Sequence, residues 1–204
     1  MQKLIERLKN LYPSPECTLV YDRDWKLLFG ARLAAQCTDE RVNKVSVFLY
    51  ERFPYLESIA SADIAEIEEI VRPCGFYRQK ARDLVFGAVK LLKNFDGKVP
   101  DTMEDLLSIP GVGRKTANLM LGELFGKPAV VADTHCIRLS NRLGLCKTKD
   151  PVKVENILRK KIPPNEQLLF CHRLVQHGRE VCHARNPVCG KCSLADICPS
   201  YRPI

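Results

Sequence analysis

The sequence predicts an all-α protein. Apolar residues recur at helical spacing along almost the whole chain, and the interruptions fall at Gly, Pro or residues that cap helices. An apolar run at 129–132 could be mistaken for a strand. It has no second run to pair with, and a strand alone is not stable in water. We therefore expect helices joined by short turns.

Caps and breakers delimit the helices of the first half. Residues 1–11 alternate charged residues with leucine, as an amphipathic helix does. Thr38 can cap the helix that follows residues 25–37. Ser61 is expected to cap the next helix, because Ile and Val recur at helical spacing after it. The sequence thus predicts helices over 1–11, 25–37 and 39–52, a helix between Ser61 and Pro73, and one after Phe76 and Tyr77 that Asp96-Gly97 closes.

The second half continues the helical pattern. Thr102 with Asp105 three residues later resembles a capping box, so a short helix should precede Pro110. Asp133 and Asp150 stand where helix N-caps are expected. The remaining predicted helices are 114–125, 133–143, 151–161 and 166–177.

The turn between two of these helices, at 109–118, has the features of a phosphate-binding site. Gly111 and Gly113 permit positive φ and a close approach, and the next helix begins with N–H groups that lack partners. Arg114 and Lys115 add positive charge. Such a turn holds a DNA backbone without reading bases. Lys115 is a nucleophile candidate, although a simple phosphate contact explains it equally well from the residues alone.

The charge of the chain agrees with a nucleic-acid partner. There are 32 Lys and Arg against 24 Asp and Glu, a net charge of +8. The basic residues occur in short groups along the chain, which predicts a folded basic face rather than a disordered arm. A basic enzyme without such a partner is the plain alternative. We find no membrane-spanning run and no signal peptide, so we expect a cytoplasmic protein without a membrane partner.

The ten cysteines form two populations. Cys136 and Cys171 belong to six scattered cysteines and are expected to be small buried apolar residues. The other four are separated by six, two and five residues near the C-terminus, and such crowding indicates a metal site: Cys182, Cys189, Cys192 and Cys198. Structural zinc sites usually pair two Cys-x-x-Cys chelates, whereas this sequence has one. The wider outer spacings favour a [4Fe-4S] cluster, with zinc as the alternative.

Several motifs together resemble the endonuclease III family of DNA glycosylases, which have a helix-hairpin-helix motif and an iron–sulfur cluster. The resemblance covers nearly the whole chain and rests on the order of the motifs as well as on their content. They are Ala-Gln-Cys-Thr-Asp at 35–39, Pro-Gly-Val-Gly-Arg-Lys-Thr-Ala-Asn at 110–118, Val-Ala-Asp-Thr-His at 131–135, His-Gly-Arg at 177–179 and the cysteine spacing.

This resemblance implies two helical domains flanking a DNA-binding cleft. Residues 18–128 would form a central domain with the helix-hairpin-helix motif. Residues 1–17 would rejoin 129–204 in a second domain that contains the cluster loop. The resemblance also implies that the four clustered cysteines hold a [4Fe-4S] cluster and that Lys115 and Asp133 meet in the cleft. We expect a monomer, associated with a bacterial or archaeal nucleoid.

The implied activity is that of a bifunctional DNA glycosylase and apurinic/apyrimidinic lyase of base excision repair. Its partner would be double-stranded DNA containing oxidised pyrimidines or abasic sites. Lys115 would attack C1′ of the extruded nucleotide, expel the base and leave a Schiff base that eliminates the 3′ phosphate. Asp133 would cap its helix and stabilise the positive charge that develops on the sugar.

The family resemblance also assigns DNA contacts. Gln36 would fill the space of the extruded nucleotide, although a glutamine bonded to its own backbone is the ordinary alternative. Phe76 would wedge into the base stack, where family members often carry leucine, unless it packs in the core. His135 either contacts DNA or packs in the first turn of its helix. Arg185 and Lys191 would meet phosphates, or form a solvated basic surface.

Two other functions remain open at this point. A monofunctional mismatch glycosylase shares the fold and the cluster, but such relatives usually lack a lysine matching Lys115. The adenine-specific kind also has an extra C-terminal domain, for which we expect no room before Ile204. A catalytically silent redox-sensing DNA-binding protein would not need Lys115 and Asp133 together.

Overall fold

The computed structural model describes residues 1–202, and these contain eleven α-helices and no strand. The all-α prediction is therefore confirmed. The chain divides into two compact units, one formed by Cys17–Phe125 and the other by Met1–Glu16 together with Gly126–Ile204.

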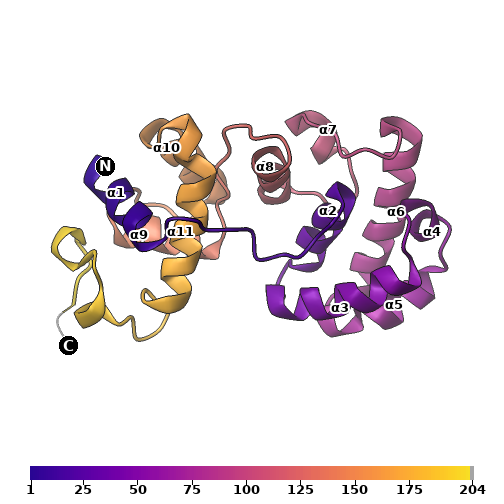
Figure 1. The fold of residues 1–204 in the computed structure, drawn as a ribbon, viewed down its shortest axis with the longest axis horizontal. Helices are drawn as coiled ribbons and strands as arrows, with labels where there is room; N and C mark the ends of the chain where they lie inside the picture. Colours follow the sequence, from indigo (N-terminus) through magenta and orange to yellow (C-terminus); the bar gives the residue numbers. More distant parts are fainter. Residues whose placement is uncertain (203–204) are drawn as a thin grey trace. The chain divides into compact units, whose positions relative to one another are not determined.

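The Cys17–Phe125 unit is built around a long central helix. Its helices are α2 (Asp24–Leu33), α3 (Asp39–Arg52), α4 (Leu56–Ala60), α5 (Ile64–Val71), α6 (Tyr77–Phe95), α7 (Met103–Leu107) and α8 (Arg114–Glu123), and the 3-10 turn η1 (Arg72–Cys74) precedes α6. Helix α6 packs against α2, α4 and α5, and α8 packs against α2 and α7 (Figure 1). The core is aliphatic and includes Leu27, Leu28, Leu49, Ile67, Leu84 and Leu91.

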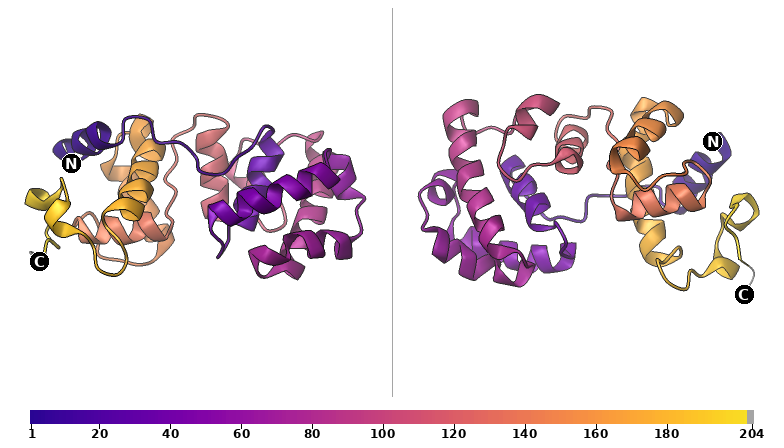
Figure 2. Two further views of the ribbon diagram at one scale, coloured as in Figure 1. Left: turned by 60° about the horizontal axis from the view of Figure 1, so that its bottom comes forward. Right: turned by 180° about the vertical axis from the view of Figure 1, so that it is seen from behind.

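The other unit brings the N-terminus to the C-terminal third of the chain. It contains α1 (Gln2–Leu11), α9 (Thr134–Arg142), α10 (Pro151–Lys161) and α11 (Gln167–Glu180), with the 3-10 turns η2 (Pro164–Glu166), η3 (Cys189–Lys191) and η4 (Ala195–Ile197). Helix α11 packs against both α1 and α9 (Figure 2). Leu8, Leu139, Phe170 and Leu174 are fully buried there.

Several caps form as the sequence predicts. The Thr38 hydroxyl accepts from Arg41 N at the start of α3, and the Asp150 carboxylate accepts from Lys153 N at the start of α10. Thr102 caps α7 by accepting from Asp105 N at 3.1 Å. Each of these caps satisfies an N–H group that the helix itself cannot.

The prediction at Ser61 was wrong. Asp63 caps α5, because its carboxylate accepts from Ala65 N at 3.0 Å. Ser61 instead ends α4, a short helix that the sequence analysis missed, and its hydroxyl donates to Glu57 O. Two other boundaries also differ from expectation: α2 ends at Leu33 rather than at residue 37, and α11 extends to Glu180.

None of the helices in residues 1–202 is long and apolar enough to cross a membrane.

Candidate functional site

The turn between α7 and α8 has the shape of a phosphate-binding hairpin. Gly111 adopts φ +76°, and a Cβ atom there would lie 2.6 Å from Arg32 Nε and 2.7 Å from Asp83 Oδ2. Only glycine fits this position, both for its φ and for the space available. Gly113 does not share this property. Its φ is −97° and the space around it is open, so the expectation of positive φ was wrong for Gly113.

Helix α8 begins without a competing carboxylate. Gly113 is its N-cap, no side chain caps the helix, and its first turn contains no acidic residue. The N–H groups and the positive end of the helix dipole are therefore available to an anion. Arg114 and Lys115 are exposed at this end of the helix. The arrangement can bind phosphate and present the Lys115 amine beside it.

Asp133 is the N-cap of α9, and its Oδ1 accepts from Cys136 N at 2.6 Å. This hydrogen bond from the backbone amide fixes the direction of the carboxylate. His135 lies two residues after Asp133. Its Nδ1 is 3.2 Å from Arg138 Nη2, and a Cβ on Gly178 would lie 2.6 Å from the same nitrogen. The half-buried His135 ring therefore has contacts within its own unit, and a DNA contact by His135 stays a prediction.

Lys115 belongs to the Cys17–Phe125 unit and Asp133 to the other unit. The meeting of these two side chains in one cleft, which the family resemblance implies, stays a prediction.

Gln36 and Phe76 both occupy exposed turns with left-handed backbone. Their φ values are 55° and 48°, a region that non-glycine residues rarely adopt. Phe76 exposes 66% of its surface, so it does not pack in the core. Gln36 is exposed, and its side chain has no hydrogen-bond partner among residues 1–202. Both side chains are therefore available to an external ligand.

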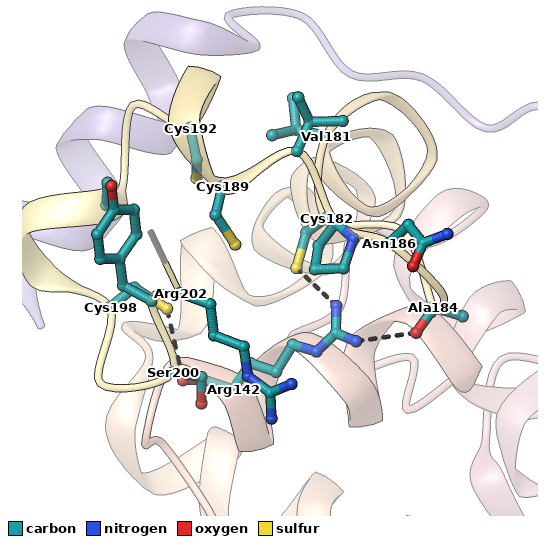
Figure 3. Close-up of a pocket in the computed structure, with 14 residues that line it drawn as sticks. Arg142, Val181, Cys182, Ala184, Asn186, Cys189, Cys192, Cys198, Ser200 and Arg202 are labelled. Atoms are coloured by element: carbon teal, nitrogen blue, oxygen red, sulfur yellow. Dashed lines mark hydrogen bonds between the residues drawn. The ribbon is translucent and has the colours of Figure 1, made fainter. Parts of the chain in front are cut away.

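The four clustered cysteines line one cavity of about 660 Å³. Figure 3 shows Cys182, Cys189, Cys192 and Cys198 around it, on the loop that follows α11. Within residues 1–202, no three His, Cys, Asp or Glu side chains are arranged to hold a single metal ion. The thiol side chains of four cysteines around one cavity fit the ligand set of a [4Fe-4S] cluster.

Two arginines of α9 hold this loop. Arg142 donates to Cys182 Sγ at 3.2 Å and to the Ala184 carbonyl, and its own carbonyl accepts from Cys198 Sγ (Figure 3). It also donates to the His183 carbonyl. Arg138 donates to the Gly178 and Cys182 carbonyls. Hydrogen bonds of this kind orient ligands and tune the potential of a cluster.

Residues of α1 and α11 contact the other side of the cysteine loop. Arg7 forms a bidentate pair with Asp196, and its hydrogen bonds lower the pKa of that carboxyl to about 2. His177 Nδ1 is 3.1 Å from the Tyr12 hydroxyl, and its Nε2 is 3.5 Å from Cys192 Sγ. Burial lowers the pKa of His177, which favours a neutral ring.

Burial raises the pKa of the Cys192 and Cys198 thiols. Iron ligands are thiolates, so cluster assembly must displace these protons. Arg185 and Lys191 are exposed on the same loop and do not line the cavity.

Comparison with known proteins agrees with this geometry. Residues 30–164 match the HhH-GPD superfamily of base excision DNA repair proteins, and residues 182–198 match the iron–sulfur binding domain of endonuclease III. The chain is 48% identical to endonuclease III of Synechocystis sp. over 95% of its own length and 89% of that protein. It belongs to the endonuclease III family. The protein is thus a DNA glycosylase of base excision repair and an iron–sulfur protein with a [4Fe-4S] cluster.

Solved structures of endonuclease III are similar over nearly the whole chain. A non-covalent endonuclease III–DNA complex superposes with a TM-score of 0.93 at 36% identity, covering 98% of this chain and 94% of that one. A trapped endonuclease III–DNA covalent intermediate gives the same values.

No local sequence pattern identifies the residues that support the cluster loop. Arg138 and Arg142 recur at helical spacing after Asp133, but on sequence alone they resemble ordinary surface charges. His177 was noted only as part of a family motif. Its contact with Cys192 gives that motif a physical role.

Proposed function

We propose that this endonuclease III family member is bifunctional, removing oxidised pyrimidines from duplex DNA and cleaving the strand 3′ to the lesion. The observation that carries the proposal is the exposed Lys115 amine at an uncapped helix start, directly behind a phosphate-binding hairpin. An amine in that place is delivered to the sugar of a nucleotide whose phosphates the hairpin holds. The covalent intermediate solved for an endonuclease III supports the same chemistry.

The reaction passes through a covalent imine between the protein and the sugar. The lone pair of Lys115 Nζ attacks C1′, the N-glycosidic bond breaks, and the base departs with the bonding electrons and takes up a proton. Ring opening gives an imine between Nζ and C1′. Loss of a proton from C2′ then expels the 3′ phosphate, and water releases the lysine. The Asp133 carboxylate, held by the hydrogen bond from Cys136 N, stabilises positive charge on the sugar and assists the proton transfers.

The [4Fe-4S] cluster would be held by Cys182, Cys189, Cys192 and Cys198. When bound, it supplies a rigid cross-link of the C-terminal loop and a centre capable of one-electron transfer. Arg185 and Lys191, exposed on that loop, are suited to contact phosphates. Chromosomal DNA of a bacterial nucleoid is the substrate that we propose in the cell.

Borohydride trapping tests this proposal. Reaction with duplex DNA that contains thymine glycol or an abasic site should give a covalent adduct, because only an amine attack passes through a reducible imine. Lys115→Gln should abolish the adduct but keep DNA binding, since the hairpin amides are untouched. Lys93→Gln, which removes an exposed lysine of α6, is the matched control and should trap normally.

Asp133→Asn separates charge from capping. Asparagine caps a helix about as well as aspartate, so the thermal stability should hold while base removal is lost. Undiminished trapping by Lys115→Gln would assign the nucleophile to another amine. Base removal without any trapping by the wild type would identify a monofunctional glycosylase.

A further inference from the structure

A fully buried lysine lies below the two exposed turns of the Cys17–Phe125 unit. Lys80, in the first turns of α6, is 0% exposed. Its ammonium donates to the carbonyls of Leu33, Ala35 and Cys74, each at 2.8 Å. An ammonium has three donors, so all of them are used.

The three carbonyls come from two separate turns. Leu33 ends α2 and Ala35 directly precedes Gln36, whereas Cys74 ends η1, two residues before Phe76. A lysine that only capped α2 would not need the Cys74 carbonyl. Gln36 and Phe76 both have left-handed φ, a conformation that persists only where the surrounding structure holds it. The hydrogen bonds of Lys80 stabilise both turns at once.

The same face of α6 also contacts the hairpin. Asp83, one turn after Lys80, is buried and accepts from Gln79 Nε2 at 2.8 Å and from Arg32 Nε at 2.6 Å. The Arg32 and Asp83 side chains lie against Gly111, where a Cβ would meet both of them below 3 Å. Helix α6 therefore relates the Gln36 turn, the Phe76 turn and the hairpin to one another.

We propose that Lys80 is a positioning residue for DNA opening: it fixes the Gln36 and Phe76 turns relative to each other and, through α6, relative to the phosphate-binding hairpin. The inference rests on the proposed function, in which these two side chains enter the duplex. Lys80 itself does not touch DNA. It acts by keeping the wedge and the space-filling side chain at a fixed separation.

Lys80→Met tests the proposal, because methionine keeps the length and the apolar stem but has no donor. Trapping is compared on a duplex with an abasic site opposite 2-aminopurine and on the same abasic strand alone. Only the duplex requires unstacking, so the variant should trap at least about tenfold more slowly on the duplex and within about threefold of wild type on the single strand. The 2-aminopurine fluorescence change on binding should also fall. Lys93→Met, on the same helix but exposed, should match the wild type in every assay.

Combining Lys80→Met with substitutions of the two side chains that it positions separates positioning from general support of the fold. With Gln36→Ala and Phe76→Ala already present, Lys80→Met should slow the duplex reaction little further, because the side chains that it positions are gone. The inference would be overturned if Lys80→Met slowed the duplex reaction of the combined variant by as much as it slows that of the wild type. It would also be overturned if Lys80→Met alone slowed trapping equally on the duplex and on the single strand, or if its duplex rate matched that of Lys93→Met. If Lys80→Met does not fold, Lys80→Arg takes its place in both comparisons with the same outcomes, since a planar guanidinium cannot donate to three converging carbonyls alike.

Failure of the inference differs from failure of the proposed function. If the wild type forms no covalent adduct with the duplex, the proposed function itself is refuted. If the wild type forms the adduct and the Lys80 variant reacts like Lys93→Met, only the role of Lys80 is refuted.

Discussion

Phe76 exposes most of a large aromatic side chain on a left-handed backbone, a combination that costs stability and buries little apolar surface. Folding alone gives no reason to keep it. Such a side chain is explained by a partner that covers it, and the neighbouring Gln36 turn has the same two properties. Exposed Asp96 and Asn186 also have positive φ, but Asp and Asn adopt this region more readily than Phe and Gln do. At the scale of single residues, residue type together with exposure and positive φ therefore distinguishes the two side chains that we propose to enter the duplex.

Phe76→Ala should weaken activity on duplex lesions by a few kcal/mol, about the cost of unstacking one base step, while leaving the melting temperature unchanged. Activity on matched lesion duplexes and thermal unfolding measure the two effects. Phe48 on α3 is the control, because it is also 66% exposed. A large fall in melting temperature with normal duplex activity would show that Phe76 supports the fold instead.

The hairpin between α7 and α8 shows how an element depends on its neighbours. Gly111 and Gly113 are alike on sequence, yet only Gly111 has positive φ and close neighbours, Arg32 and Asp83. These neighbours come from α2 and α6. The phosphate-binding turn is thus shaped by the helices below it as well as by its own glycines.

Gly111→Ala should lower the free energy of unfolding by about 1–3 kcal/mol, since it adds both backbone strain and overlap with Arg32 and Asp83. Gly113→Ala, with open space and φ −97°, should cost less than about 1 kcal/mol. Denaturant unfolding of both variants, followed by helical circular dichroism, compares them. Equal losses would mean that the contacts of Gly111 with α2 and α6 do not matter.

For the whole molecule, the cluster is the largest cross-link available to the C-terminal loop. Residues of α1, α9 and α11 converge on this loop through Arg7, Arg142 and His177. Loss of the cluster should therefore loosen the contacts of all three helices and not the loop alone.

Protein purified without oxygen should be brown and contain about four irons and four sulfides per chain, as four cysteine ligands require. Cys189→Ser should remove the colour and lower thermal stability or DNA affinity more than the rate of bond breaking once DNA is bound. Cys17→Ser, outside the cavity, should retain iron. Stoichiometric zinc without sulfide would contradict the cluster, and a stable, tightly binding Cys189→Ser variant would contradict its structural role.

The sequence by itself determined the features that depend on residues within a turn or two of each other. Periodicity predicted the helices, and Thr38, Thr102 and Asp150 were correctly identified as caps, because a cap bonds an amide two or three residues away. The cysteine spacing likewise indicated the metal site, since its ligands lie within one short loop.

Only the tertiary structure decided the features that depend on distant partners. Helix α2 ends at Leu33, before the predicted residue 37, where Lys80 binds the Leu33 and Ala35 carbonyls from 47 and 45 residues away. Arg142 likewise reaches Cys182 from 40 residues away. Lysine and arginine normally lie at the surface, so a local pattern gives no sign that these two are drawn inward. Their roles exist only once folding brings the carbonyls and the thiol to them.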